Sequence, residues 1–187
     1  MEKYIRRDTY LQKLIDRREN GEIKVITGLR RCGKSLLLKH IYRDYLIADG
    51  VPPEDIIIIS FDEDDGLDGV ELTDKENLKA FLYSRIASSS RMYYVFLDEV
   101  QQVDGFERVV NGLNARDNVD VYVTGSNSKM LSKDINTIFR GRGDEVRVSP
   151  FSFKEFCNDR SESVSELWQE YYTYGGMPAL LNRNTPA

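Results

Sequence analysis

An α/β domain built on a central parallel sheet is the fold class that the sequence predicts. Short apolar runs with strand character alternate with segments whose apolar residues recur at helical spacing. The run at 56–61 is too apolar for a strand with one face in solvent and suits a strand covered on both faces. Such alternation produces right-handed βαβ units, which join parallel strands. The expected strands are 24–27, 56–61, 93–97, 119–123 and 145–148.

Residues suited to ligand binding follow three of these strands. Gly28 comes directly after the first strand, Asp98 directly after the third, and Ser126 shortly after the fourth. In an open parallel sheet, ligands bind beyond the carboxyl ends of the strands. The pattern therefore brings these three regions to one edge of the sheet and predicts a ligand site there.

Three helices are expected between the strands. The first begins near Leu36 and ends near Asp49, where Gly50 suits the left-handed position that follows a helix. The pair Thr73 and Glu76 has the spacing of a capping box and marks the start of the second helix. Apolar residues at helical spacing mark the buried faces of the second and third helices: Leu78, Phe81, Leu82 and Ile86, then Phe106, Val109, Val110 and Leu113.

The composition excludes several classes of protein. With 187 residues, the chain has the length of one domain, or of one domain and part of another. Two cysteines are too few for a disulfide framework, and a single histidine argues against a histidine zinc site and against a Ser-His-Asp triad. The net charge of −5 argues against a chain-wide cationic surface for nucleic acid, although a local basic patch stays open. No apolar run approaches the ~20 residues of a membrane span, and no signal-peptide core is present, so a cytoplasmic location is expected.

The sequence changes character after residue 150. We expect one domain over 1–150, and over 151–187 the start of a helical lid or of a C-terminal region. Ser152 with Glu155, and Ser163 with Glu166, have the spacing of capping boxes for two short helices. Trp168 and the tyrosines at 171–174 would be unusual on a finished surface. We therefore expect the chain to be part of a longer protein.

The segment 28–35 reads Gly-Leu-Arg-Arg-Cys-Gly-Lys-Ser and matches the phosphate-loop pattern G-x-x-x-x-G-K-[ST]. It follows a predicted strand and precedes a predicted helix, which is the context that the pattern requires. Glycines let successive N–H groups turn toward one anion, and the helix N-terminus adds its dipole. We expect Lys34 to contact the β- and γ-phosphates and the Ser35 hydroxyl to bind Mg²⁺. The alternative is a glycine-rich turn with a solvated lysine. The expected nucleotide-binding residues are Gly28, Leu29, Arg30, Arg31, Cys32, Gly33, Lys34, Ser35 and Leu36.

Three side chains of this loop also have plainer interpretations. Arg30 and Arg31 face either solvent or a partner, and exposed arginine pairs are most often simply solvated. Cys32 is either a small filler or a redox-sensitive thiol near a helix N-terminus. The filler is the favoured interpretation.

An acidic pair, Asp98-Glu99, ends the third expected strand and lies 64 residues after Lys34. An aspartate at this place can hold Mg²⁺, and the adjacent glutamate can polarise the attacking water as a general base. Acidic residues after strands are common, so the pair alone is a weak signal. Together with the phosphate loop it becomes a strong one. Asp-Glu favours ATP hydrolysis over a GTPase switch, and no Asn-Lys-x-Asp segment for guanine recognition occurs.

Two further segments contain candidate catalytic residues. Ser126 is the first choice for a polar side chain that senses the γ-phosphate, with Thr124 and Asn127 as alternatives, and a simple Gly-Ser turn explains the segment nearly as well. The segment Arg140-Gly141-Arg142-Gly143 is a candidate source of an arginine that neutralises developing charge on a neighbouring subunit's nucleotide. A solvated basic turn is the favoured alternative for this segment.

Motifs in a fixed order resemble one known family. They are the phosphate loop 28–35, Phe-Leu-Asp-Glu-Val-Gln at 96–101, Thr-Gly-Ser-Asn-Ser-Lys-Met-Leu-Ser at 124–132, Gly-Arg at 141–142, Pro-Phe-Ser-Phe-Lys-Glu-Phe at 150–156, and Tyr-Gly-Gly-Met-Pro at 174–178. Together they resemble the prokaryotic AAA-type P-loop ATPase family, in which an ATPase domain is followed by a C-terminal domain of unknown function. The resemblance extends from about Tyr4 to Pro178.

The resemblance implies a P-loop NTPase three-layer sandwich with strand order 5-1-4-3-2, followed by a short helical segment. It further implies that Lys34 and Ser35 form Walker A, that Asp98 and Glu99 form Walker B, and that Ser126 is the sensor. It places an arginine finger at Arg142, a weaker match, and the residues near Ile5 and Arg7 beside the adenine. Relatives continue for roughly 200 residues more, with a winged-helix or nuclease-like region.

Together, these observations predict an ATP-binding, Mg²⁺-dependent ATPase that forms ADP and phosphate. The expected catalytic residues are Lys34, Glu99, Ser126 and Arg142, and the expected metal ligands are Ser35 and Asp98. Hydrolysis would drive or switch a protein partner or a C-terminal domain, with a homo-oligomer as a further expectation and nucleic acid left open. The alternative is a nucleotide-dependent interaction module with negligible hydrolysis that contacts DNA. A small-molecule kinase is a third option, without an acceptor-site signature.

Overall fold

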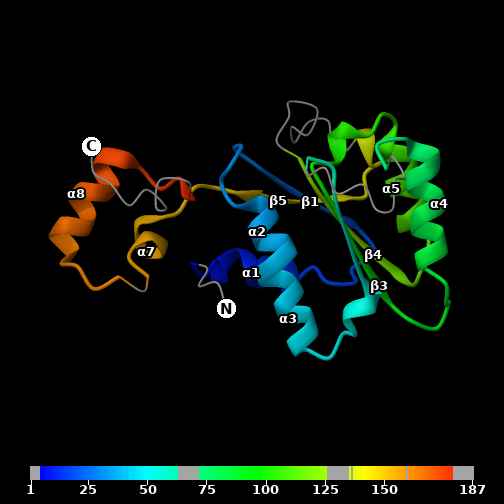
Figure 1. Ribbon diagram of the computed structural model, residues 1–187, viewed down its shortest axis with the longest axis horizontal. Coiled ribbons are helices and arrows are strands. Elements are labelled where there is room, and N and C mark those ends of the chain that lie inside the picture. Colours follow the sequence, from blue (N-terminus) through cyan, green and yellow to red (C-terminus); the bar gives the residue numbers. More distant parts are fainter. Residues whose placement is uncertain (1–4, 63–71, 126–134, 136, 159, 179–187) are drawn as a thin grey trace.

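A computed structural model describes residues 5–62, 72–125, 135, 137–158 and 160–178 of the chain. Five parallel strands form one sheet in the order β2-β3-β4-β1-β5, which confirms the predicted order 5-1-4-3-2. Figure 1 shows helices on both faces of this sheet, and the arrangement is the expected three-layer sandwich. The strands are β1 (Ile23–Gly28), β2 (Ile56–Ser60), β3 (Tyr93–Asp98), β4 (Val119–Thr124) and β5 (Gly143–Val148).

Alternation along the strands divides the core into two layers. In β3, Tyr93, Val95 and Leu97 join the apolar cluster on one face of the sheet, whereas Tyr94 and Phe96 join the cluster on the other. Successive side chains of a strand point to opposite faces, so a strand covered on both sides must be apolar throughout. All six residues of β3 are buried.

One helical layer is formed by the N-terminal half of the chain (Figure 1). It contains α1 (Asp8–Ile15) and a continuous helical stretch made of α2 (Lys34–Leu36), a π-helical part η1 (Leu37–Tyr42) and α3 (Arg43–Ala48). The stretch ends as predicted, with Gly50 at a φ of 96° in the left-handed region. The π-helical part was not expected, because its composition is that of an ordinary helix.

The opposite face of the sheet is covered by α4 (Lys75–Arg85) and α5 (Phe106–Asn114). The predicted cap of α4 was wrong by one residue. Asp74 is the N-cap, and its carboxylate accepts hydrogen bonds from the amides of Glu76 and Asn77, both at 3.0 Å. A carboxylate reaches two orphan amides at once, so it takes the place that the Thr73 spacing suggested. Short 3₁₀ turns, η2 (Pro53–Asp55) and η4 (Val100–Gln102), complete the connections.

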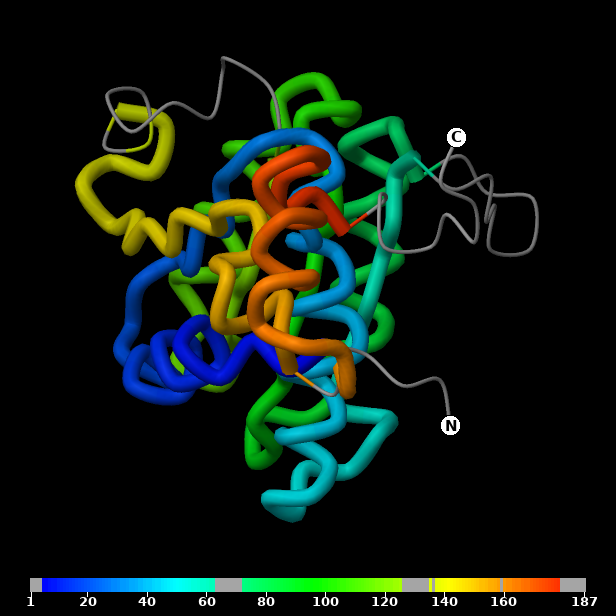
Figure 2. The backbone as a smooth tube through the Cα atoms, turned by 90° about the vertical axis from the view of Figure 1, so that its left-hand side faces the viewer, coloured from blue at the N-terminus to red at the C-terminus, as the bar shows by residue number. Residues whose placement is uncertain are grey.

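Two helices follow the sheet: α7 (Phe153–Phe156) and α8 (Val164–Tyr174). Both begin with the predicted capping boxes, Ser152 with Glu155 and Ser163 with Glu166. They lie beyond the layer of α1–α3, and Figure 2 shows α8 in front of the rest of the chain when viewed from that side. Trp168 and Tyr172 are exposed, as the sequence suggested, at 52% and 82% of their surface. Among the described residues, no helix has the length and apolar character to cross a membrane.

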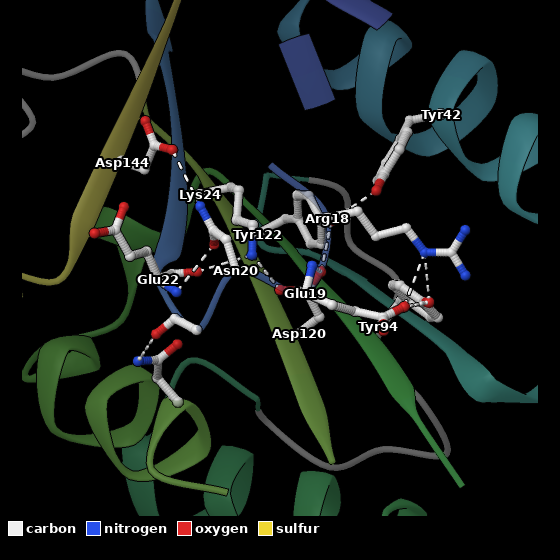
Figure 3. Close-up of polar contacts among 12 residues, drawn as sticks. Arg18, Glu19, Asn20, Glu22, Lys24, Tyr42, Tyr94, Asp120, Tyr122 and Asp144 are labelled. Atoms are coloured by element: carbon white, nitrogen blue, oxygen red, sulfur yellow. Dashed lines mark hydrogen bonds and ion pairs between the residues drawn. The ribbon is translucent and has the colours of Figure 1, made fainter. Parts of the chain in front are cut away.

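A buried polar network lies near the amino-terminal ends of β1 and β4, on the face of the sheet that the α1–α3 layer covers (Figure 3). The Lys24 ammonium is fully buried, pairs with the Asp120 carboxylate and donates to the carbonyl of Glu22 at 3.0 Å. The Tyr122 hydroxyl donates to Asp120 at 2.7 Å and contacts the Tyr42 hydroxyl at 2.6 Å. Burial raises the pKa of both tyrosines. The network therefore joins β1, β4 and the end of the π-helical stretch η1.

Candidate functional site

The segment between β1 and α2 forms a tight loop at the carboxyl edge of the sheet. Its backbone enters the left-handed region at Arg31, with a φ of 64°, and at Gly33, with a φ of 97°. Alternation between right- and left-handed residues turns successive N–H groups inward and creates an anion-binding nest. The helical stretch that starts at Lys34 adds the positive end of its dipole. The geometry therefore suits a phosphate.

Gly28, the first glycine of the loop, is required by close packing against β5. Its φ is 145°, and a Cβ at this position would lie 2.2 Å from the carbonyl oxygen of Val148. The thiol of Cys32 lies 3.4 Å from the same oxygen. The last residue of β5 thus lies directly against the loop and fixes its first turn.

Lys34 folds inward from the start of the helix. Its side chain is only 3% exposed, and its ammonium donates to the carbonyls of Gly28 at 3.4 Å and Leu29 at 3.2 Å. The same ammonium lies 3.8 Å from the carboxylate of Glu99. A positive charge is therefore held in the middle of the loop, between the nest and the end of β3.

Asp98, the last residue of β3, meets the loop from the neighbouring part of the sheet. Its Oδ1 accepts hydrogen bonds from the hydroxyls of Ser35 at 3.0 Å and Thr124 at 2.5 Å. Its Oδ2 is buried and has no hydrogen-bond donor among the described residues, and the Lys39 ammonium lies 3.7 Å away. Burial raises the pKa of Asp98, while the two hydroxyl hydrogen bonds and the Lys39 charge oppose that shift. The buried carboxylate keeps one oxygen available for a cation.

Glu99 has a strained backbone that turns it away from Asp98. Its φ of 54° and ψ of 45° lie in the left-handed region, which is uncommon for a residue with a side chain. Its N–H donates to the hydroxyl of Thr124 at 2.9 Å, and its carboxylate accepts a hydrogen bond from the amide of Gln101. Thr124 thus contacts both acidic residues, and two neighbouring carboxylates are held in different orientations.

A cavity of about 840 Å³ opens over this group of residues. That volume is within the usual range of small-molecule sites. It combines cationic and anionic side chains, as a site for a metal-bound phosphate needs. The lining residues are Arg30, Arg31, Gly33, Lys34, Ser35, Leu36, Asp62, Glu99, Gln101 and Gln102.

Two side chains at the site were not expected from the sequence. Lys39 donates to the Ser60 hydroxyl at 2.8 Å, at the end of β2, in addition to its approach to Asp98. Its position four residues after Ser35 places both on one helical face, a spacing that could have indicated it. Gln101 contacts Glu99 from the 3₁₀ turn, and no sequence pattern pointed to that contact.

The remaining predicted residues do not line the cavity or are not described by the structure. Ser126 and Asn127 lie outside the described residues. Arg142 is exposed and directly precedes β5, and Gly143 pairs with Ile23 at the amino-terminal end of β1. Five residues of strand separate that end from the loop, a distance of ~17 Å. Arg7 does not line the cavity, but its buried guanidinium contacts the loop, donating to the carbonyl of Cys32 at 3.1 Å.

The structure favours the filler interpretation of Cys32. Burial raises the pKa of this thiol, which reduces the thiolate that an alkylating agent attacks. Iodoacetamide at pH 8 is therefore expected to modify Cys32 at least ~10-fold more slowly than the partly exposed Cys157. Peptide mass spectrometry over time measures both rates, and the urea-unfolded chain is the control in which the difference disappears. Equal rates in the folded chain would contradict the buried position of Cys32.

The fold and the loop together define a nucleotide-binding protein of the P-loop ATPase class. The family model AAA_14, described as an AAA domain, matches residues 20–157, which is more than half of the chain. The chain therefore belongs to this AAA domain family.

Two curated relatives match the chain. An uncharacterized protein of Haemophilus influenzae is 36% identical over 187 residues, which cover 97% of this chain and 46% of the relative. The uncharacterized protein MJ1544 of Methanocaldococcus jannaschii is 32% identical over 172 residues, which cover 86% of this chain and 36% of the relative. The chain thus spans less than half of the length of these relatives.

Solved structures show the same fold at low sequence identity. The Walker-type ATPase PABY2304 of Pyrococcus abyssi superimposes with a TM-score of 0.64 at 19% identity, covering 95% of this chain and 65% of that one. PCH-2 of C. elegans superimposes with a TM-score of 0.60 at 14% identity, covering 96% of this chain and 62% of that one. At these identities the likeness establishes the architecture.

Proposed function

We propose that this chain binds ATP together with Mg²⁺ and hydrolyses it to ADP and phosphate, and that the cycle drives or switches a protein partner or a C-terminal domain. One observation carries the proposal. The loop residues Lys34 and Ser35 meet Asp98 and Glu99, more than 60 residues later in the chain, at the carboxyl edge of the sheet. A cation, a hydroxyl and two differently oriented carboxylates are the groups that phosphoryl transfer to water requires.

The phosphate loop supplies the binding groups for the triphosphate. N–H groups between Gly28 and Lys34 surround the phosphate oxygens in the nest, and the Lys34 ammonium neutralises charge on the β- and γ-phosphates. Lys34 needs no long movement for this role, because it already lies within the loop. Burial of its stem keeps the ammonium near the phosphates.

Ser35 and Asp98 are the residues that would hold Mg²⁺. The fit rests on the buried Oδ2 of Asp98, which lacks a hydrogen-bond donor among the described residues, and on the hard oxygen donors that Mg²⁺ prefers. Within the described part of the chain, no three His, Cys, Asp or Glu side chains gather as a metal site. Few protein ligands combined with phosphate oxygens and water are usual for this ion. When bound, Mg²⁺ neutralises charge on the phosphate oxygens.

Glu99 is the proposed general base. Its carboxylate accepts a proton from water while the water oxygen forms a bond to the γ-phosphorus, and the bond from that phosphorus to the bridging oxygen of ADP breaks. The Thr124 hydroxyl fixes the Glu99 backbone and Gln101 fixes its carboxylate. Strain at Glu99 is thus held in place by two contacts, as is common at functional positions.

Arg142 is proposed to act on the nucleotide of a second copy. Its position at the amino-terminal edge of β5 is too far from the phosphate loop of the same chain. The Arg142 side chain is exposed and can therefore approach a neighbouring molecule. This role requires a homo-oligomer.

Ser126 is proposed as the sensor of the γ-phosphate, and this proposal rests on the sequence alone.

Replacing Lys34 by alanine tests the binding step. The loss of a charge-assisted contact to phosphate is expected to weaken binding of a non-hydrolysable ATP analogue with Mg²⁺ by ~10-fold or more, measured by titration calorimetry. Lys79→Ala, an exposed lysine on α4, is the matched control and should bind like the unmodified chain. Equal affinities of the Lys34 and Lys79 variants, or no heat of binding in the unmodified chain, would refute the proposed function.

A further inference from the structure

Arg7, just before α1, is the largest fully buried side chain of the protein among the described residues, with 1% of its surface exposed. A fully buried arginine is rare and needs partners for its charge and its five donors. The guanidinium is sandwiched between aromatic rings, with its carbon 4.5 Å from the centre of the Tyr10 ring and 4.8 Å from that of Phe151. The proposed reaction gives Arg7 no role, so its burial needs a separate explanation.

Three polar contacts join Arg7 to three separate parts of the chain. Nη1 donates to the carbonyl of Cys32 in the phosphate loop at 3.1 Å. Nη2 donates to the carbonyl of Ser149, just after β5, at 2.7 Å. Nε pairs with the Glu155 carboxylate on α7 at 2.9 Å. One planar side chain thus bridges the phosphate loop and the helices that follow the sheet.

Glu155 extends this contact into the two C-terminal helices. While Oε1 faces Arg7, Oε2 accepts hydrogen bonds from the N–H and hydroxyl of Ser152 and forms the cap of α7. The α7 helix packs on α8 through aromatic rings, Phe153 against Trp168 at 4.9 Å and Phe156 against Tyr171 at 5.3 Å between ring centres. If Arg7 moves, Glu155 and the cap of α7 move with it, and α8 follows because it packs on α7.

The end of the described chain returns to the same place. Gly176 accepts a hydrogen bond from the N–H of Phe151 at 2.7 Å, and a Cβ on Gly176 would lie 2.1 Å from the Phe151 carbonyl oxygen. A Cβ placed on Gly33 would lie 3.6 Å from Nη1 of Arg7 and 3.8 Å from Cγ of Pro178. The Tyr-Gly-Gly-Met-Pro segment, to which the proposed reaction gives no role, thus packs beside the phosphate loop.

We infer that Arg7 couples the phosphate loop to the α7–α8 segment, so that nucleotide binding in the loop repositions these helices. The inference rests on the proposed function, since it requires a phosphate in the nest. The carbonyl of Cys32 and the N–H of Gly33 belong to one planar peptide unit and point in opposite directions. Arg7 holds the oxygen end of that unit, and a phosphate in the nest takes the N–H end. A rotation of the peptide that improves one contact necessarily changes the other.

Trp168 provides a natural reporter of this coupling. It is the only tryptophan in the sequence, it packs edge-to-face on Phe153, and about half of its surface is exposed. Its fluorescence therefore reports the packing of α7 on α8, away from the cavity. In the unmodified 187-residue chain, a non-hydrolysable ATP analogue with Mg²⁺ is expected to change the emission of Trp168 with the same saturation curve that calorimetry gives for binding.

Two variants interrupt the coupling in different ways. Arg7→Lys keeps the charge but removes the planar fork that contacts three partners at once. Glu155→Gln removes the charge facing Arg7 but keeps a residue that completes a capping box. Each is expected to reduce the Trp168 response at least ~5-fold, while the analogue still binds by calorimetry with an affinity lowered by ~5-fold. Arg6→Lys, at the neighbouring exposed arginine, is the matched control and should respond like the unmodified chain.

The possible results separate this inference from the proposed function. An unchanged Trp168 response in both variants, or calorimetric binding without any Trp168 response in the unmodified chain, overturns the coupling and leaves ATP binding intact. No calorimetric binding in the unmodified chain overturns the proposed function, and the coupling with it. If circular dichroism shows that Arg7→Lys is unfolded, the Trp168 response of Glu155→Gln tests the coupling instead. Glutamine at position 155 can still cap α7 with Ser152.

Discussion

Replacing Glu99 by glutamine is expected to lower the rate of ATP hydrolysis by ~10²- to 10⁴-fold, the usual contribution of a general base. Glutamine has the same shape and can still accept the hydrogen bond from Gln101, but it cannot accept a proton from water. Lys34 and Ser35 are untouched, so ATP should bind at least as tightly. Single-turnover release of phosphate measures the chemical step, and calorimetry measures binding of the analogue.

The control for this prediction is a charge-matched change outside the cavity. Glu107→Gln, on α5, removes the same charge and should hydrolyse ATP at the rate of the unmodified chain. Equal rates for the Glu99 variant and the unmodified chain would end the assignment of Glu99 as the base. Slow, equal rates in all three proteins, with intact binding, would instead favour a nucleotide-dependent interaction module.

The second large effect is expected on the free energy of unfolding, at Lys24, whose buried charge pairs with Asp120. Lys24→Met should lower the free energy of unfolding by ~3–5 kcal/mol, because it leaves the Asp120 carboxylate buried without its cation. Hydrogen bonds from Tyr122 and from the N–H of Glu19 remain but carry no full charge. Urea unfolding followed by circular dichroism measures the loss.

Adding Asp120→Asn distinguishes an unpaired charge from a simple loss of packing. The double variant has no buried carboxylate, so it should be more stable than the sum of the two single changes predicts, by ~1 kcal/mol or more. Lys13→Met, on the exposed side of α1, is the control and should change stability by less than ~0.5 kcal/mol. A Lys24 variant as stable as this control would show that Asp120 does not depend on its partner.

Features encoded in local patterns were predictable. The β3 strand was placed to within one residue, because a run of apolar residues buried on both faces has no competing structure. The tight loop between β1 and α2 was predicted from the spacing of its glycines, and Gly33 has a φ of 97° there, as the geometry of an anion nest requires. The start of β5 was placed two residues late, since Gly143 and Asp144 have no strand character and join the strand by pairing with Ile23 and Lys24.

Features that depend on contacts between distant segments were not predictable. Arg7 meets Ser149 across 142 residues of sequence, and its burial follows from Tyr10 and Phe151 closing over it. Lys24 and Asp120 look like ordinary strand residues until the register of β1 on β4, with Lys24 opposite Tyr122, brings the charges together. A single sequence gives the elements but not this register.

The close approach of Gly28 to Val148 has an evolutionary consequence. Since any side chain at Gly28 would collide with a neighbouring strand rather than with a ligand, selection for folding alone is enough to retain this glycine. If the chain binds ATP as proposed, a descendant that lost this binding would be expected to keep Gly28 while Lys34 drifted. Among distant members of the family, the lysine is therefore the better marker of an active protein, and the first glycine marks only the architecture.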